Sequence, residues 1–392
     1  MDLFILDDTL RRSQVVDTYE SLIWTERFKA VGDFELQVKS DRGTRALFPA
    51  GTRLAINASK RVMEVETIEN KVNSNGTNIL SIKGRSIEKL LMDRSNRRDS
   101  IAAGDTPGAS NTTGTPGNIA RAMFDTICRN NTVIPGDVIP FLQPGSMLPA
   151  GSIPEPSEVV TMTYNTGTVY DFIQNVADIY DLGFRLLRKE LPNGATSQLY
   201  FDIYTGDDRT TLQTTNDAVI FSAELDNLSD TTELTSTALY KNVAYVFGLN
   251  GSKIVYLPGF DANTAGFNRR VLIVDAHDIE LADGPALMAA LEQRGQEELA
   301  KNGVVIAFDG EIPQFGSYIY GVHYDLGDLV ETRNSDGLST NMLVTEQIFA
   351  VDATGTRSYP TLESRLLITA GSWYAWDAGE YWDDADGYWA DA

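Results

Sequence analysis

Short runs of alternating or β-branched residues recur along this chain, and they constrain its fold more than any other sequence feature. Residues 33–38 alternate strictly, so that their three apolar side chains share one face. The dipeptide Asn250-Gly251 separates the apolar runs 242–248 and 253–257, and it is a strong signal for a two-residue β-hairpin. Runs of this kind, bounded by Gly, Asn, Asp and Pro, are typical of a chain built mainly from β-strands.

The same criteria predict further strands and a few short helices. The additional strands are expected at residues 62–69, 78–83, 184–189, 198–204, 303–308, 328–332 and 342–351. Helical spacing of apolar residues predicts helices at 86–93, 118–129, 168–180 and 285–301. Thr168 and Asp171 can form a capping box for the third helix, whereas Gly295 weakens the fourth by about 1 kcal/mol. The expected fold class is therefore α+β, mainly β with a few short helices.

Two stretches interrupt this pattern. Residues 103–117 are rich in Gly, Ser, Thr and Asn, which predicts an exposed loop or linker. Residues 134–156 contain six of the fourteen prolines of the chain, which predicts an irregular connection.

The length and the charge of the chain bound its functions. A chain of 392 residues corresponds to about two to four domains. Its 32 basic and 55 acidic residues give a formal net charge of −23, which opposes binding to nucleic acid or to anionic lipid. No apolar run of about 18 residues predicts a membrane span, and the acidic N-terminus does not resemble a secretory signal. We therefore expect a protein made in the cytoplasm and not stably inserted in a membrane.

The sequence offers little for catalysis or for metal binding. Its one cysteine, Cys128, excludes an intramolecular disulfide and a cysteine-based zinc site, and we expect it to be a packed, inert thiol. His277 and His323, the two histidines, are expected at the surface or at strand edges. The chain contains no phosphate-binding loop and no zinc-protease motif. These observations predict a protein that is not an enzyme and that needs no cofactor or metal.

The C-terminal segment has an unusual composition. Residues 366–392 contain six acidic residues, no basic residue and four of the five tryptophans, namely Trp373, Trp376, Trp382 and Trp389. Aromatic residues at this density usually dock onto a partner, so we expect these four to be partner-docking residues; the alternative is a solvated end. Asp384 and Asp386 are spaced like two calcium ligands, but no closing glutamate follows, so at most a loose calcium contact is expected.

Four motifs, in this order along the chain, resemble a known family. They are Trp24 followed by Gly32-Asp33-Phe34-Glu35-Leu36; Ile82-Lys83-Gly84-Arg85 leading to Leu91; Tyr204-Thr205-Gly206-Asp207-Asp208-Arg209 leading to Ser222; and Tyr324-Asp325-Leu326-Gly327-Asp328-Leu329-Val330. Over roughly residues 20–365 the chain resembles actinobacteriophage minor tail proteins with a Gp28/Gp37-like domain. That family is similar to the tail-tip or baseplate hub proteins of siphophages.

The resemblance implies two tail-tube-like β-barrel domains with a smaller inserted domain. The first would occupy residues 1–100, which 198–230 could complete, and 101–197 would be the inserted domain. Residues 231–365 would form the second barrel domain, and 366–392 the acidic, tryptophan-rich tail. Gly32, Phe34, Leu36 and Gly327 are expected to be packing and turn positions.

The resemblance also implies a function and partners. The protein would be a structural hub of the virion tail tip, acting as a homotrimer whose ring joins the tail tube or distal tail ring to the central fibre or receptor-binding apparatus. Other minor tail proteins would be its neighbours. Genomic DNA would contact it only in transit, because acidic channel walls would repel phosphates.

Two other functions remain open from the sequence. The first is a tail-associated cell-wall hydrolase, since some pairs among 55 acidic residues will lie at the separation that glycoside hydrolysis requires. The second is a carbohydrate-binding module, suggested by the tryptophans. Sugar-stacking aromatics usually require rigid strands, whereas these four lie in an acidic terminal segment.

Overall fold

A computed structural model describes most of the chain and divides it into two compact units. The described residues are 1–72, 78–97, 110–192, 195–227, 229–277, 279, 281–282, 284–303, 305–311, 318–333 and 339–364. Residues 1–235 and 305–364 form one unit, here called the main unit, and residues 236–304 form the second, here called the inserted unit. Strands account for 41% and helices for 20% of the chain, which confirms the predicted, mainly β fold class.

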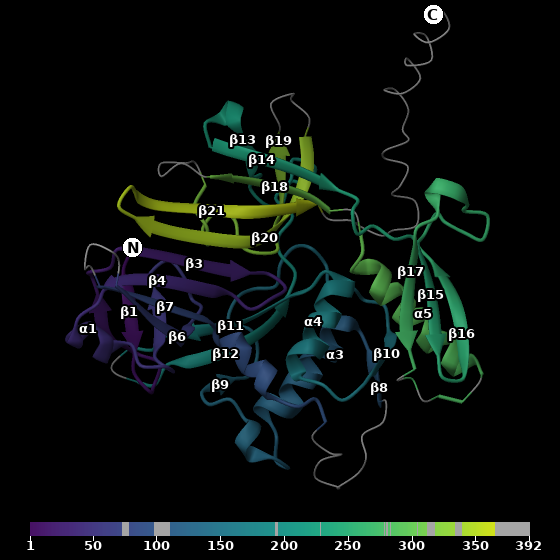
Figure 1. Ribbon diagram of the computed structural model, residues 1–392, viewed down its shortest axis with the longest axis horizontal. Coiled ribbons are helices and arrows are strands. Elements are labelled where there is room, and N and C mark those ends of the chain that lie inside the picture. Colours follow the sequence, from purple (N-terminus) through teal and green to yellow (C-terminus); the bar gives the residue numbers. More distant parts are fainter. Residues whose placement is uncertain are drawn as a thin grey trace, which may run out of the picture. The chain divides into compact units, whose positions relative to one another are not determined.

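One thirteen-stranded sheet runs through the main unit (Figure 1). Its order is β14-β18-β21-β20-β3-β4-β7-β6-β5-β1-β2, and β19 joins it beside β20 and carries β13 on its other side. The strands are β1 (Leu3–Leu6), β2 (Arg12–Val16), β3 (Ser21–Arg27), β4 (Asp33–Lys39), β5 (Arg53–Ile56), β6 (Met63–Val72), β7 (Asn78–Ser86), β13 (Ile220–Ser222), β14 (Ser229–Ser236), β18 (Val305–Glu311), β19 (Leu329–Arg333), β20 (Ser339–Asp352) and β21 (Gly355–Ser364).

The N-terminal and C-terminal parts of the chain meet in this sheet through β3 and β20. The two strands are antiparallel, with Trp24 opposite Phe349 and Ile23 opposite Ala350. The alternation seen in the sequence of β4, which pairs with β3, places Phe34 and Leu36 in the same buried core as Trp24 of β3. Residues more than 300 positions apart therefore share one hydrogen-bonded ladder, which no local pattern predicts.

The described strands do not form a closed barrel, so the two tube-like barrels remain a prediction. β13 falls within residues 198–230, which the sequence assigned to the completion of the first barrel. It pairs with β19, in the C-terminal part of the sheet, rather than with a strand of residues 1–100. The limits of the inserted unit, at 236 and 304, fall inside the segment that the sequence assigned to a second barrel domain.

The middle of the main unit combines helices with small sheets. The helical elements are α1 (Arg42–Leu47), η1 (Ile87–Asp93), α3 (Pro116–Phe124), the π-helical turn η2 (Asp125–Arg129), η3 (Pro135–Asp137), α4 (Val169–Tyr180) and η4 (Ala223–Leu225). The strands are β8 (Ser110–Gly114), β9 (Leu142–Gln143), β10 (Val160–Tyr164), β11 (Gly183–Lys189) and β12 (Gln198–Tyr204). β11 and β12 are antiparallel, and helices α3 and α4 pack in the same hydrophobic cluster as these strands.

The predictions for this middle region had mixed outcomes. The capping box of Thr168 and Asp171 begins α4, which confirms the helix predicted at 168–180. The helix predicted at 86–93 is a 3₁₀-helix. Within the predicted loop 103–117, residues 103–109 lie outside the described residues and 110–114 form strand β8, paired with β10. That part of the loop prediction is wrong, because the strand forms by pairing with a distant segment. Residues 134–156 are irregular apart from η3 and the two-residue strand β9, as their prolines predict.

The inserted unit is a three-stranded sheet with one helix against it (Figure 1). Its elements are β15 (Val243–Gly248), β16 (Gly251–Tyr256), η5 (Gly266–Asn268), β17 (Val271–Ala276) and α5 (Pro285–Ala300). The tight β15–β16 hairpin confirms a hairpin at this place, but its two-residue turn is Leu249-Asn250, because Gly251 already pairs with Gly248. Gly295 lies where α5 approaches the sheet, since a Cβ atom there would be 2.6 Å from Val255. The glycine that weakened the helix prediction thus allows close packing of helix on sheet.

Candidate functional site

Charged side chains lie buried between the hydrophobic clusters of the main unit. The clusters centre on β11, β12 and helices α3 and α4, on β3 to β7, and on β13, β19 and β20. We call this group of charged side chains and tyrosines the polar junction, and its residues are buried apart from the partly buried Tyr320 and Asp325. It consists of Glu26, Arg61, Glu88, Arg185, Asp202, Tyr204, Tyr320 and Asp325. These residues come from the N-terminal, middle and C-terminal segments, so the junction joins parts that are distant in sequence.

Arg61 is the centre of the polar junction. Its side chain is only 2% exposed, and its Nη1 lies 3.3 Å from Glu88 Oε1, while its Nε lies 3.6 Å from Glu26 Oε2. Its Nη2 also donates to the carbonyl of Arg27 at 2.8 Å. A buried ion needs this degree of compensation, because its desolvation costs several kcal/mol. Glu88 in turn accepts from the backbone N–H of Leu186 at 2.9 Å, which ties η1 to β11.

Glu26 connects the junction to the C-terminal part of the sheet. It accepts hydrogen bonds from Trp24 Nε1 and from the hydroxyl of Tyr320, each at 3.1 Å. Burial raises the pKa of the Glu26 carboxyl, and the nearby charge of Arg61 only partly opposes this.

Arg185 extends the junction from β11 toward the C-terminal segment. Its guanidinium lies 3.4 Å from Asp202, the residue opposite it on β12, and 3.5 Å from Asp325. It also stacks over the ring of Tyr204 at 3.7 Å from the centroid, a cation–π arrangement. Burial raises the pKa of Tyr204 to about 12, so its hydroxyl stays protonated at neutral pH.

A second ionic contact fixes the segment after β12 to the turn before β19. Asp328 accepts from Arg209 Nε and from the backbone N–H of Asp207, both at 2.7 Å. Burial raises the pKa of Asp328 to about 6, even though these hydrogen bonds favour its ionised form. Gly206 and Gly327 allow this contact, since a Cβ atom on Gly206 would lie 2.1 Å from the carbonyl carbon of Gly327.

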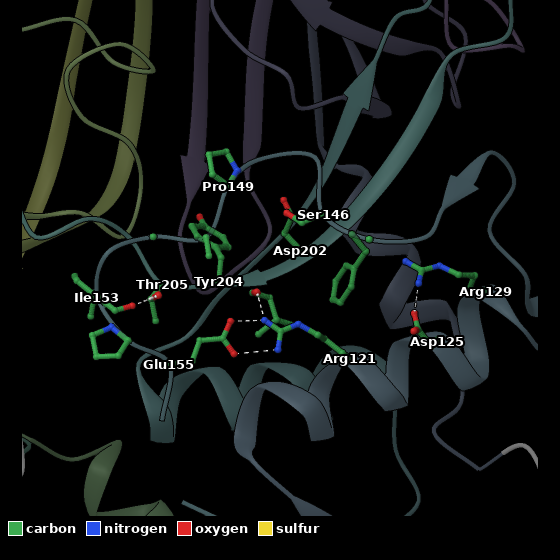
Figure 2. Close-up of a pocket in the computed structure, with 16 residues that line it drawn as sticks. Arg121, Asp125, Arg129, Ser146, Pro149, Ile153, Glu155, Asp202, Tyr204 and Thr205 are labelled. Carbon is green, nitrogen blue, oxygen red and sulfur yellow. Dashed lines mark hydrogen bonds and ion pairs between the residues drawn. The ribbon is translucent and has the colours of Figure 1, made fainter. Parts of the chain in front are cut away.

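A pocket of about 600 Å³ lies beside β12 (Figure 2). Among the described strands, β9 pairs only with the start of β12, so the later part of this edge faces the loop at 145–155. Arg121 reaches into the pocket and donates to Glu155 at 2.9 Å and to the carbonyl of Ile203 at 2.7 Å. Arg129 is paired with Asp125 at 2.6 Å. Both arginines of the pocket are therefore paired with an acidic side chain from its own lining.

None of the residues tested for catalysis from the sequence lines this pocket. Cys128 is fully buried and burial raises the pKa of its thiol to about 12, which makes it a poor nucleophile. His277 contacts Asp275 on the exposed end of β17, and the ring of His323 accepts from the backbone of Ile319. Across the described ranges, no group of three or more His, Cys, Asp or Glu side chains is arranged to hold a metal ion.

The predicted packing positions occupy the places that the sequence indicates. Phe34 and Leu36 are buried in the sheet core, and Gly327 has φ +89° with Phe28 directly against it. The four tryptophans predicted to dock a partner, Trp373, Trp376, Trp382 and Trp389, lie outside the described residues. Asp384 and Asp386 also lie outside them.

Sequence reasoning missed the polar junction. Its charged residues are scattered along the sequence from Glu26 to Asp325, and only tertiary contacts bring them together. One weak signal exists: Arg185 lies inside β11 between the apolar residues Phe184 and Leu186. A charge inside an apolar strand needs a buried partner, but the sequence does not say which residue supplies it.

Two solved structures share this fold. One is the tail protein from Neisseria meningitidis MC58, with a TM-score of 0.54 and 14% identity over 94% of this chain and 98% of that one. The other is the 43 kDa tail protein of prophage MuSo2 from Shewanella oneidensis, with a TM-score of 0.53 and 15% identity over 92% and 97% of the two chains. A search among curated proteins gave no match. The chain is therefore similar in fold to these two tail proteins.

The family follows from the sequence match. A model of the Siphovirus ReqiPepy6 Gp37-like protein family matches residues 2–363, nearly the whole chain. The chain belongs to this family, which confirms the resemblance found in its motifs. No described helix is both long and apolar enough to cross a membrane.

Proposed function

We propose that this protein is a structural component of the siphovirus tail tip. It resides in the virion tail, and its family and its fold, shared with two tail proteins, support this role. Two observations carry the proposal: the chain belongs to a siphovirus tail protein family, and its main unit contains the polar junction. A part that transmits force along a tail must hold its segments in fixed positions, and buried, paired charges are costly to separate.

The role is architectural rather than enzymatic. The inert Cys128 and the mutually paired charges of the pocket support this part of the proposal. No observation in the described residues favours the cell-wall hydrolase or the carbohydrate-binding module.

More specifically, we propose that three copies of this chain form a ring. The ring joins the tail tube or distal tail ring to the central fibre or receptor-binding apparatus, beside other minor tail proteins. The long sheet offers a route to such a ring, because β2 and β14 stand at its two ends and each has only one neighbour among the described strands. Strand edges of this kind pair readily with another chain. DNA passes through the ring in transit, and the net charge of −23 supports passage without adhesion.

The tryptophans of residues 366–392 are the proposed partner-docking residues at the assembled tip. Deleting 372–392 removes all four and leaves the described residues intact. We expect the truncated protein to fold normally but to be incorporated into fewer tails. Normal incorporation would contradict the docking role without affecting the proposal of a tail-tip location.

Two experiments test the main proposal. Antibodies against this chain should label intact virions at the end of the tail distal to the capsid, in negative-stain images. Labelling only at the capsid, or no chain in purified virions, would overturn the proposal. The absolute mass of the isolated ring should be three times that of the chain, and a sixfold ring would contradict the trimer alone.

A further inference from the structure

The sheet of the inserted unit has one covered face and one open face. Helix α5 packs on the first face, where Ala244, Val246 and Val255 are buried. The opposite face, here called the open face, carries the other side chains of the three strands. They are Tyr245, Phe247, Ser252, Ile254, Tyr256, Val271, Ile273 and Asp275, together with Val243, whose side chain is buried.

Apolar and aromatic side chains dominate the open face. Ile254 and Ile273 lie directly opposite Tyr245 on its two sides, so the three form a row across the sheet. Ile254 is 48% exposed, Ile273 is 66% exposed and Phe247 is 44% exposed. An isolated exposed apolar residue is ordinary, but a contiguous row across a sheet marks a surface that another segment covers.

Charged groups stand at the two ends of the open face. Arg269 lies at one end, where its guanidinium is 5.6 Å from the ring centroid of Tyr245 and donates to the Tyr245 hydroxyl at 2.9 Å. Asp275, at the other end, is paired with His277. The Arg269 end is therefore suited to an acidic, aromatic segment, while the centre is suited to apolar rings.

We propose that, in the unassembled protein, residues 366–392 of the same chain cover the open face. This segment has four tryptophans, three tyrosines and six acidic residues, with no basic residue. Its aromatic rings match the apolar row, and its carboxylates match Arg269. The proposal concerns the free chain, so it stands whether or not the segment later docks onto a neighbour.

The path of the chain places this segment within reach. Glu363, at the end of β21, is paired with Ala307, and β18 begins only two residues before Ala307, where the inserted unit rejoins the main unit. Neighbouring strands are about 5 Å apart. An extended segment of 27 residues spans up to about 90 Å, whereas a unit of 69 residues has a radius of gyration of about 11 Å. Length therefore does not limit docking to the open face.

The tryptophan distribution provides a direct test. The four tail tryptophans can be observed by subtracting the fluorescence of a chain that ends at Gly371 from that of the full chain, because Trp24 is then the only one left. We expect the difference spectrum to lie at shorter wavelength than that of a synthetic peptide of residues 366–392. Ile273→Glu should shift it most of the way to the peptide spectrum. Leu212→Glu, a matched control at an 84% exposed residue of the main unit, should not.

Three results would overturn this proposal. The first is a difference spectrum equal to that of the free peptide. The second is a shift that survives Ile273→Glu, which would mean that the segment docks elsewhere or that another surface covers the open face. The third is a shift that disappears on dilution, which would mean docking between chains. Circular dichroism would verify that Ile273→Glu keeps the fold. None of these results depends on tail assembly, so the location of the protein in the virion is tested separately.

Discussion

The two units of this protein treat charge and apolar surface in opposite ways. The main unit buries ionised side chains, and Arg61, Glu26 and Glu88 are each at most 3% exposed. The inserted unit leaves Ile254 and Ile273 exposed on the open face of its sheet. The main unit thus buries charged groups, and the inserted unit exposes apolar groups to solvent.

This difference indicates two kinds of structural task. Buried charges do little for net stability, but separating them is costly, so they hold three segments of the main unit in one arrangement. An exposed apolar face contributes nothing to the stability of its own unit until a second segment covers it. The segments of the main unit are therefore held by its own buried ion pairs, whereas the inserted unit exposes an apolar face.

The largest expected effect comes from removing the central charge of the polar junction. Arg61→Met leaves Glu26 and Glu88 buried without a counter-charge, which typically costs 3–5 kcal/mol, so we expect a loss of about 4 kcal/mol in the free energy of unfolding. Urea denaturation followed by circular dichroism would measure it. Combining Arg61→Met with Glu26→Gln and Glu88→Gln should recover part of the loss.

Arg53→Met is the matched control for this variant. Arg53 pairs with Glu64 at 3.2 Å, but its side chain is 37% exposed, so its loss should cost about 0–1 kcal/mol. Equal losses for the two arginine variants would show that the polar junction is not a special feature of the main unit.

A substitution that creates a cavity in the inserted unit should destabilise that unit alone. Leu291 is fully buried between α5 and the sheet, and Leu291→Ala should cost about 3 kcal/mol through lost burial and an unfilled cavity. Hydrogen–deuterium exchange should accelerate in peptides from residues 236–304 and stay unchanged in those from β3 to β7. Acceleration throughout the chain would mean that the two units unfold together.

The close approach of Gly206 and Gly327 gives a smaller expected effect. A methyl group at Gly206 would meet the backbone of Gly327, so Gly206→Ala should cost about 2 kcal/mol by forcing the segments apart. Gly136→Ala is the matched control, because no atom lies within 4 Å of a Cβ atom there. Thermal unfolding of both variants would measure the difference, and equal midpoints would mean that the contact adjusts freely.

The smallest expected effect is a pH dependence from Asp328. Its pKa is raised to about 6 in the folded state from an ordinary value of 3.8, so the folded protein binds this proton more tightly than the unfolded chain. Its contribution to stability is fully present below pH 3.8 and is lost as the pH rises through about 6. Relative to Asp328→Asn, the unmodified protein should therefore gain about 1 kcal/mol between pH 7.5 and pH 5. Parallel stability curves for the two proteins would contradict this.

The sequence predicted the local elements of the fold well where one local pattern decides them. The capping box of Thr168 and Asp171 acts over a few residues and was predicted correctly. The β15–β16 hairpin is equally local and was predicted in the right place, although its turn is Leu249-Asn250, one residue before the predicted one. β8 was missed because its residues are those of a loop and become a strand only by pairing with β10, about 50 residues later. The helix at 86–93 was predicted in the right place, but as an α-helix rather than the 3₁₀-helix found.

By itself, the sequence determined the mainly β class, the acidic character and, through its four motifs, the family of the chain. Only the tertiary structure decided that β3 pairs with β20, that Arg61 meets Glu26 and Glu88, and that one face of the β15–β17 sheet is open. The physical reason is the distance along the chain over which each kind of interaction acts. Alternation, capping and turn propensity act between neighbouring residues, whereas the pairing of buried charges depends on which distant segments exclude water together.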